Sequence, residues 1–407
     1  MGSAEKQESA NATNVGGQAV IEGVMMRAPG ALTIVCRRQS NGELVVRERS
    51  VPLATSGPMT WPLVRGAAVL VSSLRLGSQA LRWSADILEK DLDAQERKAA
   101  AEADGALVRD DDSPKDKAKK AAAIDKVASP PTFTAAMSVM LVSMLSTTGT
   151  EEPLPADEKS GGSKLLTILP IVFAVGLFVA APQLAAEGLN SLFKLGLEVQ
   201  SPGYQVITGI SKLTIVVAYL GAIRQNDDIR RVFQYHGAEH KAISTLEAGS
   251  DLTVEAARPT SPLHARCGTT FLVMVAMVSV VLFSAVGAFL PPLPGGRAVQ
   301  GIGFFLMKLP LLPVVAAITY EIQRVFAKYC TTGPLRVLLW PGFLVQKITT
   351  AEPDDDQLEV ALASLRTALA RAAEPVAVAP PDASYESYDA LSDAVPAVAA
   401  VAHARAA

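Results

Sequence analysis

Two long runs without a charged residue limit what this chain can fold into. They are Leu165–Ala186 and Cys267–Gly296, and each is longer than the roughly 20 residues that an α-helix needs to cross a bilayer. Apolar segments of this length are difficult to fold in water. The sequence, of which 49% is hydrophobic, therefore predicts a mainly α-helical membrane protein rather than a soluble enzyme.

Two further segments, Gly203–Ile223 and Gly301–Tyr320, are apolar apart from one lysine each, Lys212 and Lys308. A charge near mid-span costs on the order of 3 kcal/mol unless it reaches the interface or finds a partner. We interpret both segments as spans, which gives a polytopic protein with about four transmembrane helices. The lysines fall at similar depth, so they either snorkel, which is the favoured interpretation, or face a shared polar cavity that holds a carboxylate or an anionic substrate.

Charge placement predicts the topology. Four spans put the N-terminal region, the histidine-rich segment and the C-terminal tail on the side with nearly all Lys and Arg, which is expected to be cytoplasmic or stromal. If the uncharged Val127–Thr150 stretch also crossed the membrane, the N-terminal region would lie on the opposite side from the histidine-rich segment. We therefore place this stretch at the interface or in a re-entrant hairpin. A net charge of −3 argues against a nucleic-acid binder. Three scattered cysteines predict no disulfide framework.

The remaining segments have weaker signals. Ala31–Arg38 and Glu43–Arg49 alternate around Asn41-Gly42, which predicts a β-hairpin. Apolar residues from Pro62 to about Leu88 recur at helical spacing. The expected organisation is a disordered segment (1–14), a hairpin and amphipathic helix (15–90), a charged linker with a possible interfacial segment and an acidic insertion (91–164), a first transmembrane hairpin (165–225), a histidine-rich loop (226–268), a second transmembrane hairpin (269–322), interfacial and C-terminal amphipathic helices, the last capped by Asp354 (323–371), and a disordered tail (372–407).

A glycine-rich stretch near the N-terminus, GGQAVIEGVMMR, contains Gln18 and Glu22 within an apolar string. Its glycines allow the backbone to approach another group closely. The spacing matches neither a phosphate-binding loop nor a dinucleotide fingerprint. A buried strand or turn and a site-forming loop are equally good interpretations.

The segment with the most chemistry is His236-Gly-Ala-Glu239-His240, an H-x-x-E-H pattern that inverts the zinc-protease motif. Asn226 is a candidate N-cap and Gly249 is placed to end a helix. In a helix the two imidazoles lie one turn apart and can reach one ion. Glu239 can then orient a metal-bound water or take its proton.

Four residues compete as a third metal ligand. His264 and Cys267 follow about twenty residues later, Glu247 lies on the same helical face as His240, and Glu321 ends the last apolar segment. The pattern alone slightly favours a hydrogen-bonded cluster without metal. The nearby histidine and cysteine shift the balance towards a site with one position open for water.

Five blocks, GGQAVIEGVMMR, RRVFQYHGAEHKAI, HARCGTTF, the Tyr320-Glu321 pair and QKITTAEPDDDQLEVA, occur in this order. The chain resembles the YqhQ-like family of multi-pass membrane proteins, known from bacteria and plastid-bearing organisms. The resemblance implies a bacterial inner membrane or plastid membrane and a predicted metal-dependent enzyme. It implies these polar positions: Glu22, His236, Glu239, His240, His264, Cys267 and Glu321. The linker at 91–126, the insertion at 151–163 and the Ala/Pro tail depart from the family pattern.

Two functions fit the sequence. In the first, the protein is a zinc-dependent hydrolase at the membrane surface, with Glu239 as base and a lipid-linked or membrane-protein substrate. In the second, it is a non-enzymatic assembly or quality-control factor, or a transporter, that uses the same cluster structurally. Paired Lys212 and Lys308 would suit anion transport.

Overall fold

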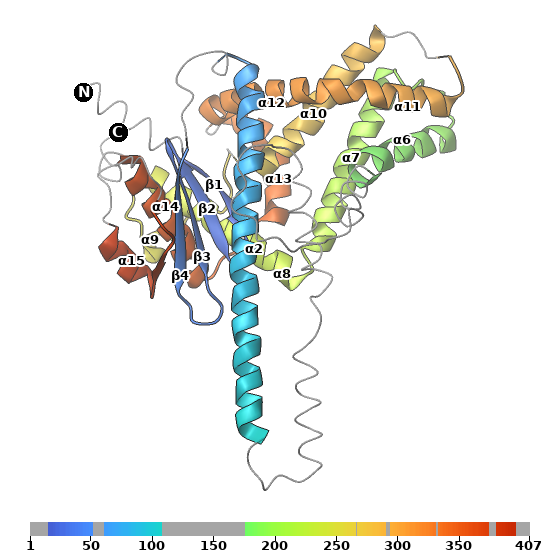
Figure 1. The fold of residues 1–407 in the computed structure, drawn as a ribbon. Helices are drawn as coiled ribbons and strands as arrows, with labels where there is room; N and C mark the ends of the chain where they lie inside the picture. The colour runs from blue at the N-terminus through green and yellow to red at the C-terminus, as the bar shows by residue number, and fades with distance from the viewer. Residues whose placement is uncertain are drawn as a thin grey trace, which may run out of the picture.

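The computed structural model describes residues 15–51, 61–107, 176–265, 267–289, 294–330, 333–373 and 380–395. It is mainly α-helical, with one small antiparallel sheet (Figure 1). The predicted disorder of residues 1–14, the insertion, the Val127–Thr150 stretch and the first half of the predicted Leu165–Ala186 span all lie outside the described residues.

The sheet has five strands in sequential order, each antiparallel to its neighbour: β1 (Gly16–Val20), β2 (Gly23–Ala28), β3 (Ala31–Arg37), β4 (Leu44–Ser50) and β5 (Ala383–Tyr385). The predicted hairpin is confirmed by β3 and β4, whose turn holds Gly42 at φ +76°. The glycine-rich motif forms β1, β2 and the tight turn between them, so its strand-and-turn interpretation is correct.

The prediction of a disordered tail from residue 372 is wrong for residues 380–395. Strand β5 pairs with β4, and helix α15 (Tyr388–Ala394) packs behind it. The Tyr388 hydroxyl donates to the Leu252 carbonyl at 2.6 Å, and Leu391 is fully buried. A strand of three residues within Ala/Pro-rich sequence gives almost no periodic signal, yet it covers an edge that would otherwise be open.

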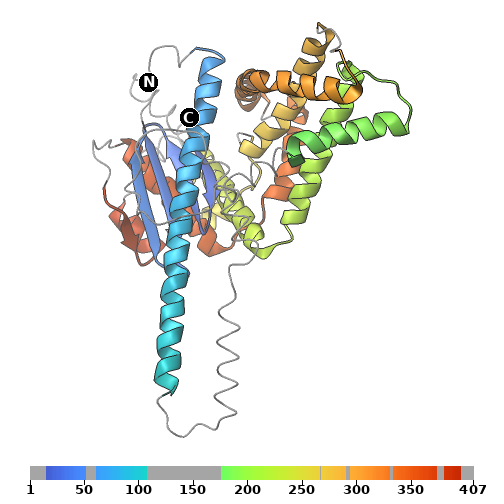
Figure 2. The same ribbon diagram turned by 45° about the vertical axis from the view of Figure 1, so that its right-hand side comes forward.

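Helices cover both faces of the sheet (Figures 1 and 2). On one face lie α8 (Asp227–Glu247) and α14 (Asp355–Ala373), and on the other lies α2 (Val64–Leu107). Successive side chains of β2 point to opposite faces of the sheet, which explains why both faces are covered. Met26 faces α14, while Met25 faces Trp83 of α2. Helix α2 is longer than the predicted 62–88 helix and includes the first part of the predicted linker.

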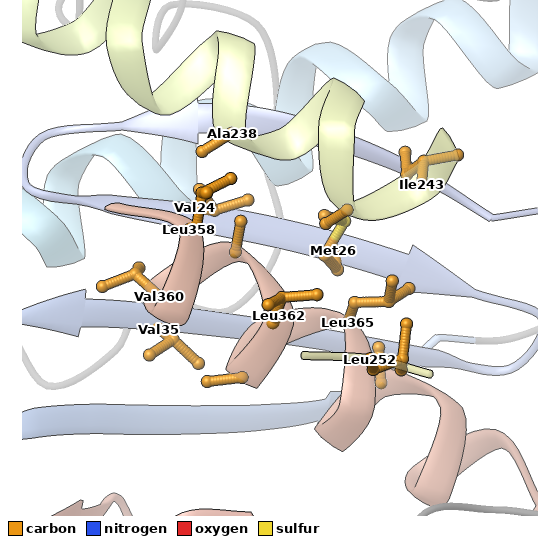
Figure 3. Packing of buried hydrophobic residues seen from close by; sticks show 14 of the residues in the cluster. Val24, Met26, Val35, Ala238, Ile243, Leu252, Leu358, Val360, Leu362 and Leu365 are labelled. Carbon is orange, nitrogen blue, oxygen red and sulfur yellow. The ribbon is translucent and has the colours of Figure 1, made fainter. Parts of the chain in front are cut away.

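The main core lies between the sheet and the α8–α14 layer. Figure 3 shows its apolar side chains from three segments that are distant in sequence: Val24, Met26, Val35, Ala238, Ile243, Leu252, Leu358, Val360, Leu362 and Leu365. The predicted Asp354 cap is confirmed. Its carboxylate accepts from the Gln357 backbone N–H at 2.8 Å, and the Gln357 side chain accepts from the Asp354 N–H at 3.0 Å. Twelve of the 19 residues of α14 are buried, so it is a core helix.

Three helical segments of the described chain are long and apolar enough to cross a membrane: Pro202–Ile223, Gly268–Gly287 and Val299–Phe326. They correspond to α7 (Pro202–Ile223), α10 (Gly268–Ala288), and α11 (Arg297–Lys308) with α12 (Leu312–Tyr329), which a 3₁₀ turn joins. The described part of the first predicted span, residues 176–186, forms a π-helical turn and the start of α6 (Ala181–Leu192), and because residues 165–175 lie outside the described residues this span stays a prediction.

Two short helices complete the described chain. They are α9 (Val254–Ala257), between α8 and α10, and α13 (Trp340–Thr349), which a 3₁₀ turn at Pro334–Leu339 precedes. Pro341 lies in the first turn of α13, where a missing N–H costs nothing, so the proline starts this helix rather than breaking it.

Candidate metal centre

Helix α8 provides the frame of the site, and its predicted ends are confirmed. The Asn226 side chain accepts from the backbone N–H groups of Asp228 at 3.0 Å and Ile229 at 3.3 Å. Gly249, at φ +64°, follows the last turn. The histidine-rich "loop" is therefore mostly a helix, and the ring centroids of His236 and His240 lie 4.5 Å apart on it.

Glycine is a poor helix former, but a close backbone contact explains why Gly237 lies in α8. The segment after α13 crosses α8 here, and the Ala351 N–H donates to the Phe233 carbonyl at 2.9 Å. A Cβ at position 237 would overlap the Ala351 carbonyl oxygen. The glycine therefore lets residues 349–351 lie directly on the helix, beside His236.

We expect Gly237→Ala to lower the free energy of unfolding by about 1 to 3 kcal/mol, because overpacking at this contact outweighs the better helix propensity of alanine. Gly188→Ala in α6 is the matched control. A Cβ there meets nothing within 4 Å, so its stability should be equal or slightly higher. Thermal unfolding of the purified protein measures both changes, and equal midpoints for the two variants would contradict the explanation.

Backbone carbonyls fix the tautomer of both histidine rings. The Nδ1 of His236 lies 2.8 Å from the Thr349 carbonyl oxygen, and the Nδ1 of His240 lies 2.5 Å from that of Pro262. Because a carbonyl only accepts, each Nδ1 carries the proton and each Nε2 offers a lone pair. Burial lowers the pKa of His240, which favours the neutral ring that metal binding needs.

Cys267 completes the cluster. It is the N-cap of α10, where its sulfur accepts from the Thr269 N–H at 3.4 Å. The sulfur lies 3.2 Å from the Nε2 of His236 and within hydrogen-bond reach of His240. One donor atom from each of the three residues lies within 4.8 Å of the others.

This donor set fits zinc. Two imidazole nitrogens and one thiolate are ligands that zinc accepts with a fourth position open. Carbonyl oxygens behind both rings are the outer-shell partners that metal-binding histidines usually have. The thiol that now faces His236 would lose its proton on binding.

Glu239 lies beside the cluster. Its Oε2 is 3.5 Å from the His240 Nε2, and the side chain is only 5% exposed. The Gly17 N–H of β1 donates to its carboxylate, and a Cβ at position 17 would come within 2.8 Å of Oε1. Burial raises the pKa of Glu239, against the opposing effects of His236, His264 and this N–H. A raised carboxylate pKa suits a general base at neutral pH.

The other predicted ligands have different partners. His264 lies near the cluster, with its ring 5.9 Å from that of His240, but its Nε2 is 3.2 Å from Glu247 Oε2. Glu321 pairs with Arg65 through two hydrogen bonds of 2.7 and 2.5 Å, which join α12 to α2. Of the four competing third ligands, Cys267 is the one that the structure groups with both histidines.

The remaining polar candidates either fix neighbouring elements against each other or lie outside the cluster. Glu22, in the β1–β2 turn, forms a 2.5 Å ion pair with Arg231 and accepts from the Tyr235 hydroxyl at 3.3 Å, which fixes the turn against α8. The Gln18 side chain lies against Gly77 of α2. Lys212 and Lys308 line one cavity between apolar helices.

Sequence reasoning missed the groups that orient the site. The carbonyls of Thr349 and Pro262 give no side-chain signal. Gln346 accepts from the His264 N–H at 2.9 Å and donates to its carbonyl at 2.7 Å, so it ties the segment before Cys267 to α13. Gln346 and Thr349 lie in the block QKITT, and its place among the family blocks was the available signal.

Comparison with known proteins places the chain in a family. A model described as "Protein of unknown function (DUF1385)" matches residues 61–371. The chain is similar to "Uncharacterized protein YqhQ" of Bacillus subtilis (strain 168), with 32% identity over 226 residues. That alignment covers 54% of this chain and 66%, just under two thirds, of the relative. No solved structure matches. The chain therefore belongs to the DUF1385 family of proteins of unknown function, as its resemblance to YqhQ-like proteins predicted.

Proposed function

We propose that this protein is a multi-pass membrane protein that binds zinc through His236, His240 and Cys267 and hydrolyses its substrate with Glu239 as general base. One observation carries the proposal. Two Nε2 lone pairs and one sulfur converge while carbonyl oxygens hold the opposite side of each ring. A purely structural cluster does not require both rings to present the same atom to a cysteine.

The position of the cluster supports action at a membrane surface. Helix α8 begins four residues after α7 ends, and Cys267 directly precedes α10. Both α7 and α10 are apolar enough to cross a bilayer. The cluster therefore lies where two candidate spans end. Arg224, Arg230 and Arg231 at this end favour the cytoplasmic or stromal side.

The chain's own residues have distinct roles in this proposal. The Thr349 and Pro262 carbonyls hold the imidazoles in one tautomer, and the Gly17 N–H holds the Glu239 carboxylate. Glu239 takes a proton from the attacking water and returns it to the leaving group. A zinc ion in such a site supplies a Lewis acid and a water whose pKa is about 7. The location favours an ester or amide bond in a lipid-linked or membrane-protein substrate.

Metal content tests the proposal first. We expect the purified full-length protein to contain about one zinc per chain by elemental analysis, and Cys267→Ser to bind zinc at least about 100-fold more weakly, because a ligand matters more than the outer-shell groups that cost 10- to 100-fold. Cys330→Ser is the matched control, since Cys330 is also buried but lies outside the cluster.

A wild-type protein without zinc, manganese or iron would contradict the proposal. Equal metal loss in both cysteine variants would mean that the substitution disturbs the fold rather than a ligand. Either result would favour the non-enzymatic alternative, in which the cluster holds α8 against α10 and α13.

A further inference from the structure

A second polar site lies among the apolar helices. A cavity of about 80 Å³ is lined by residues of α6, α7, α10 and the α11–α12 pair, which lie in the same part of the fold (Figure 1). Ser279 in its wall is twelve residues after Cys267, which is about 18 Å along α10 at 1.5 Å per residue. The cavity is thus separate from the metal centre, so a ligand can bind there whether or not the cluster holds zinc.

Lys308 points into the helix bundle. Its Nζ donates to the Gln205 side-chain oxygen at 2.9 Å and lies 4.6 and 5.1 Å from the ring centroids of Phe304 and Phe283. Gln205 is itself buried. These groups hold the ammonium in place and do not neutralise its charge. The expectation that this lysine snorkels to an interface is therefore not what the structure shows.

Lys212 adds a second positive charge to the same cavity. It comes from α7, one turn after Thr208, and within the described part of the chain its ammonium has no hydrogen-bond or ion-pair partner. The described residues that line the cavity include no Asp or Glu. Among the described residues, these two ammonium groups therefore share an apolar bundle without an acidic residue in the cavity wall, an arrangement that is costly. An anion between them removes this cost.

A larger cavity of about 440 Å³ adjoins the first. The two share Gln183 and Phe305 in their walls, and the second has a mostly apolar lining with Leu184 and Ile302. A polar end with two lysines beside an apolar chamber fits a molecule with an anionic head and a hydrocarbon chain.

We propose that the lysine cavity binds an oxyanion, a carboxylate or phosphate group, between Lys212 and Lys308. The apolar chamber makes a lipid head group the expected source, with the acyl chain in the second cavity. Free inorganic phosphate is the other source of the same chemistry, and the test separates the two.

Binding to the purified full-length protein tests the proposal. Native mass spectrometry measures retention of phosphatidylglycerol, of the fatty acid oleate and of zwitterionic phosphatidylcholine. Thermal unfolding measures stabilisation by millimolar inorganic phosphate. We expect retention of the anionic lipids over phosphatidylcholine, and at least about tenfold weaker retention by Lys212→Gln, because a charge-assisted contact is lost. Lys194→Gln, the same change at an exposed lysine, should bind as the wild type does.

The unfolding temperature of Lys212→Gln without ligand tests whether Lys212 has a purely structural role. Because Lys212 has no partner among the described residues, Lys212→Gln should unfold at the same or a higher temperature without ligand. Stabilisation by phosphate alone, lost in this variant, would support the oxyanion site and overturn the lipid as its source. Equal binding of every ligand by wild type and Lys212→Gln, or a Lys212→Gln protein that does not fold, would overturn the proposal.

Discussion

Replacing His236 with alanine is expected to remove zinc from the purified protein, while His264→Ala keeps about one zinc per chain. The two histidines make a matched pair, because both lie next to His240, with centroids 4.5 and 5.9 Å away. They differ in what their Nε2 atoms face: Cys267 for His236, and Glu247 for His264. Removing a ligand from a three-residue site leaves two donors, which hold zinc poorly at neutral pH.

Elemental analysis of the three proteins, purified side by side, measures the effect. Size-exclusion elution and the unfolding midpoint show whether His236→Ala still folds, since the variant also loses the contact with the Thr349 carbonyl. Loss of zinc from His264→Ala with retention in His236→Ala would contradict the ligand set. Loss from both would make His264 a ligand, and the cluster would then have four protein donors and no open position for water.

Local signals predicted the parts of this site that one helix determines. Asn226, Gly249 and the spacing of His236 and His240 are all properties of α8, and short-range hydrogen bonds and the 3.6-residue period set them. The same is true of the β3–β4 hairpin and the Asp354 cap. In each case the decisive contacts lie within a few residues in sequence.

The third ligand could not be predicted, because it depends on where the start of α10 meets α8. That meeting is set by Gln346, which binds both backbone groups of His264 from 82 residues away, and by the Ala351 segment resting on Gly237. Glu321 was a reasonable candidate from its position alone. Its partner Arg65 is 256 residues distant, and no periodicity reports such a pairing.

The core that packs on the sheet could not be predicted from local signals either. The N-terminal motif, the histidine helix and the helix after Asp354 were predicted as separate segments, yet they form one core around Met26, Ala238 and Leu362 (Figure 3). Helix α14 is buried on two sides, so its apolar stripe is wider than a surface helix needs. The sequence predicted only an amphipathic helix here, and the spacing of its apolar residues could not identify the strands that cover it.

The Glu239→Gln variant should keep its zinc and lose about 10²- to 10⁴-fold in hydrolysis rate, the usual contribution of a general base. Glutamine keeps the shape of the side chain, and its oxygen can still accept from the Gly17 N–H. It has no basic oxygen to take a proton from water. The ligand atoms of His236, His240 and Cys267 are unchanged, so metal content and the unfolding midpoint should stay near the wild-type values.

The assay places each protein in lipid vesicles with a mixture of ester-linked lipids and membrane peptides, and mass spectrometry follows their cleavage. Glu255→Gln is the control, the same change at an exposed carboxylate on α9, and it should cleave at the wild-type rate.

Because Glu239 is buried, comparing Glu239→Gln with the wild type distinguishes a catalytic role from a structural one. Glu239 is a buried carboxylate whose pKa burial raises, so in a protein without hydrolase activity, neutralising it removes a desolvation cost and should leave stability equal or raise it. A stabilised Glu239→Gln protein that cleaves as fast as the wild type would assign the residue a structural role. A variant that keeps both zinc and fold but has lost turnover has no explanation in packing, because the lost function then belongs to the carboxylate oxygens 3.5 Å from the His240 ring.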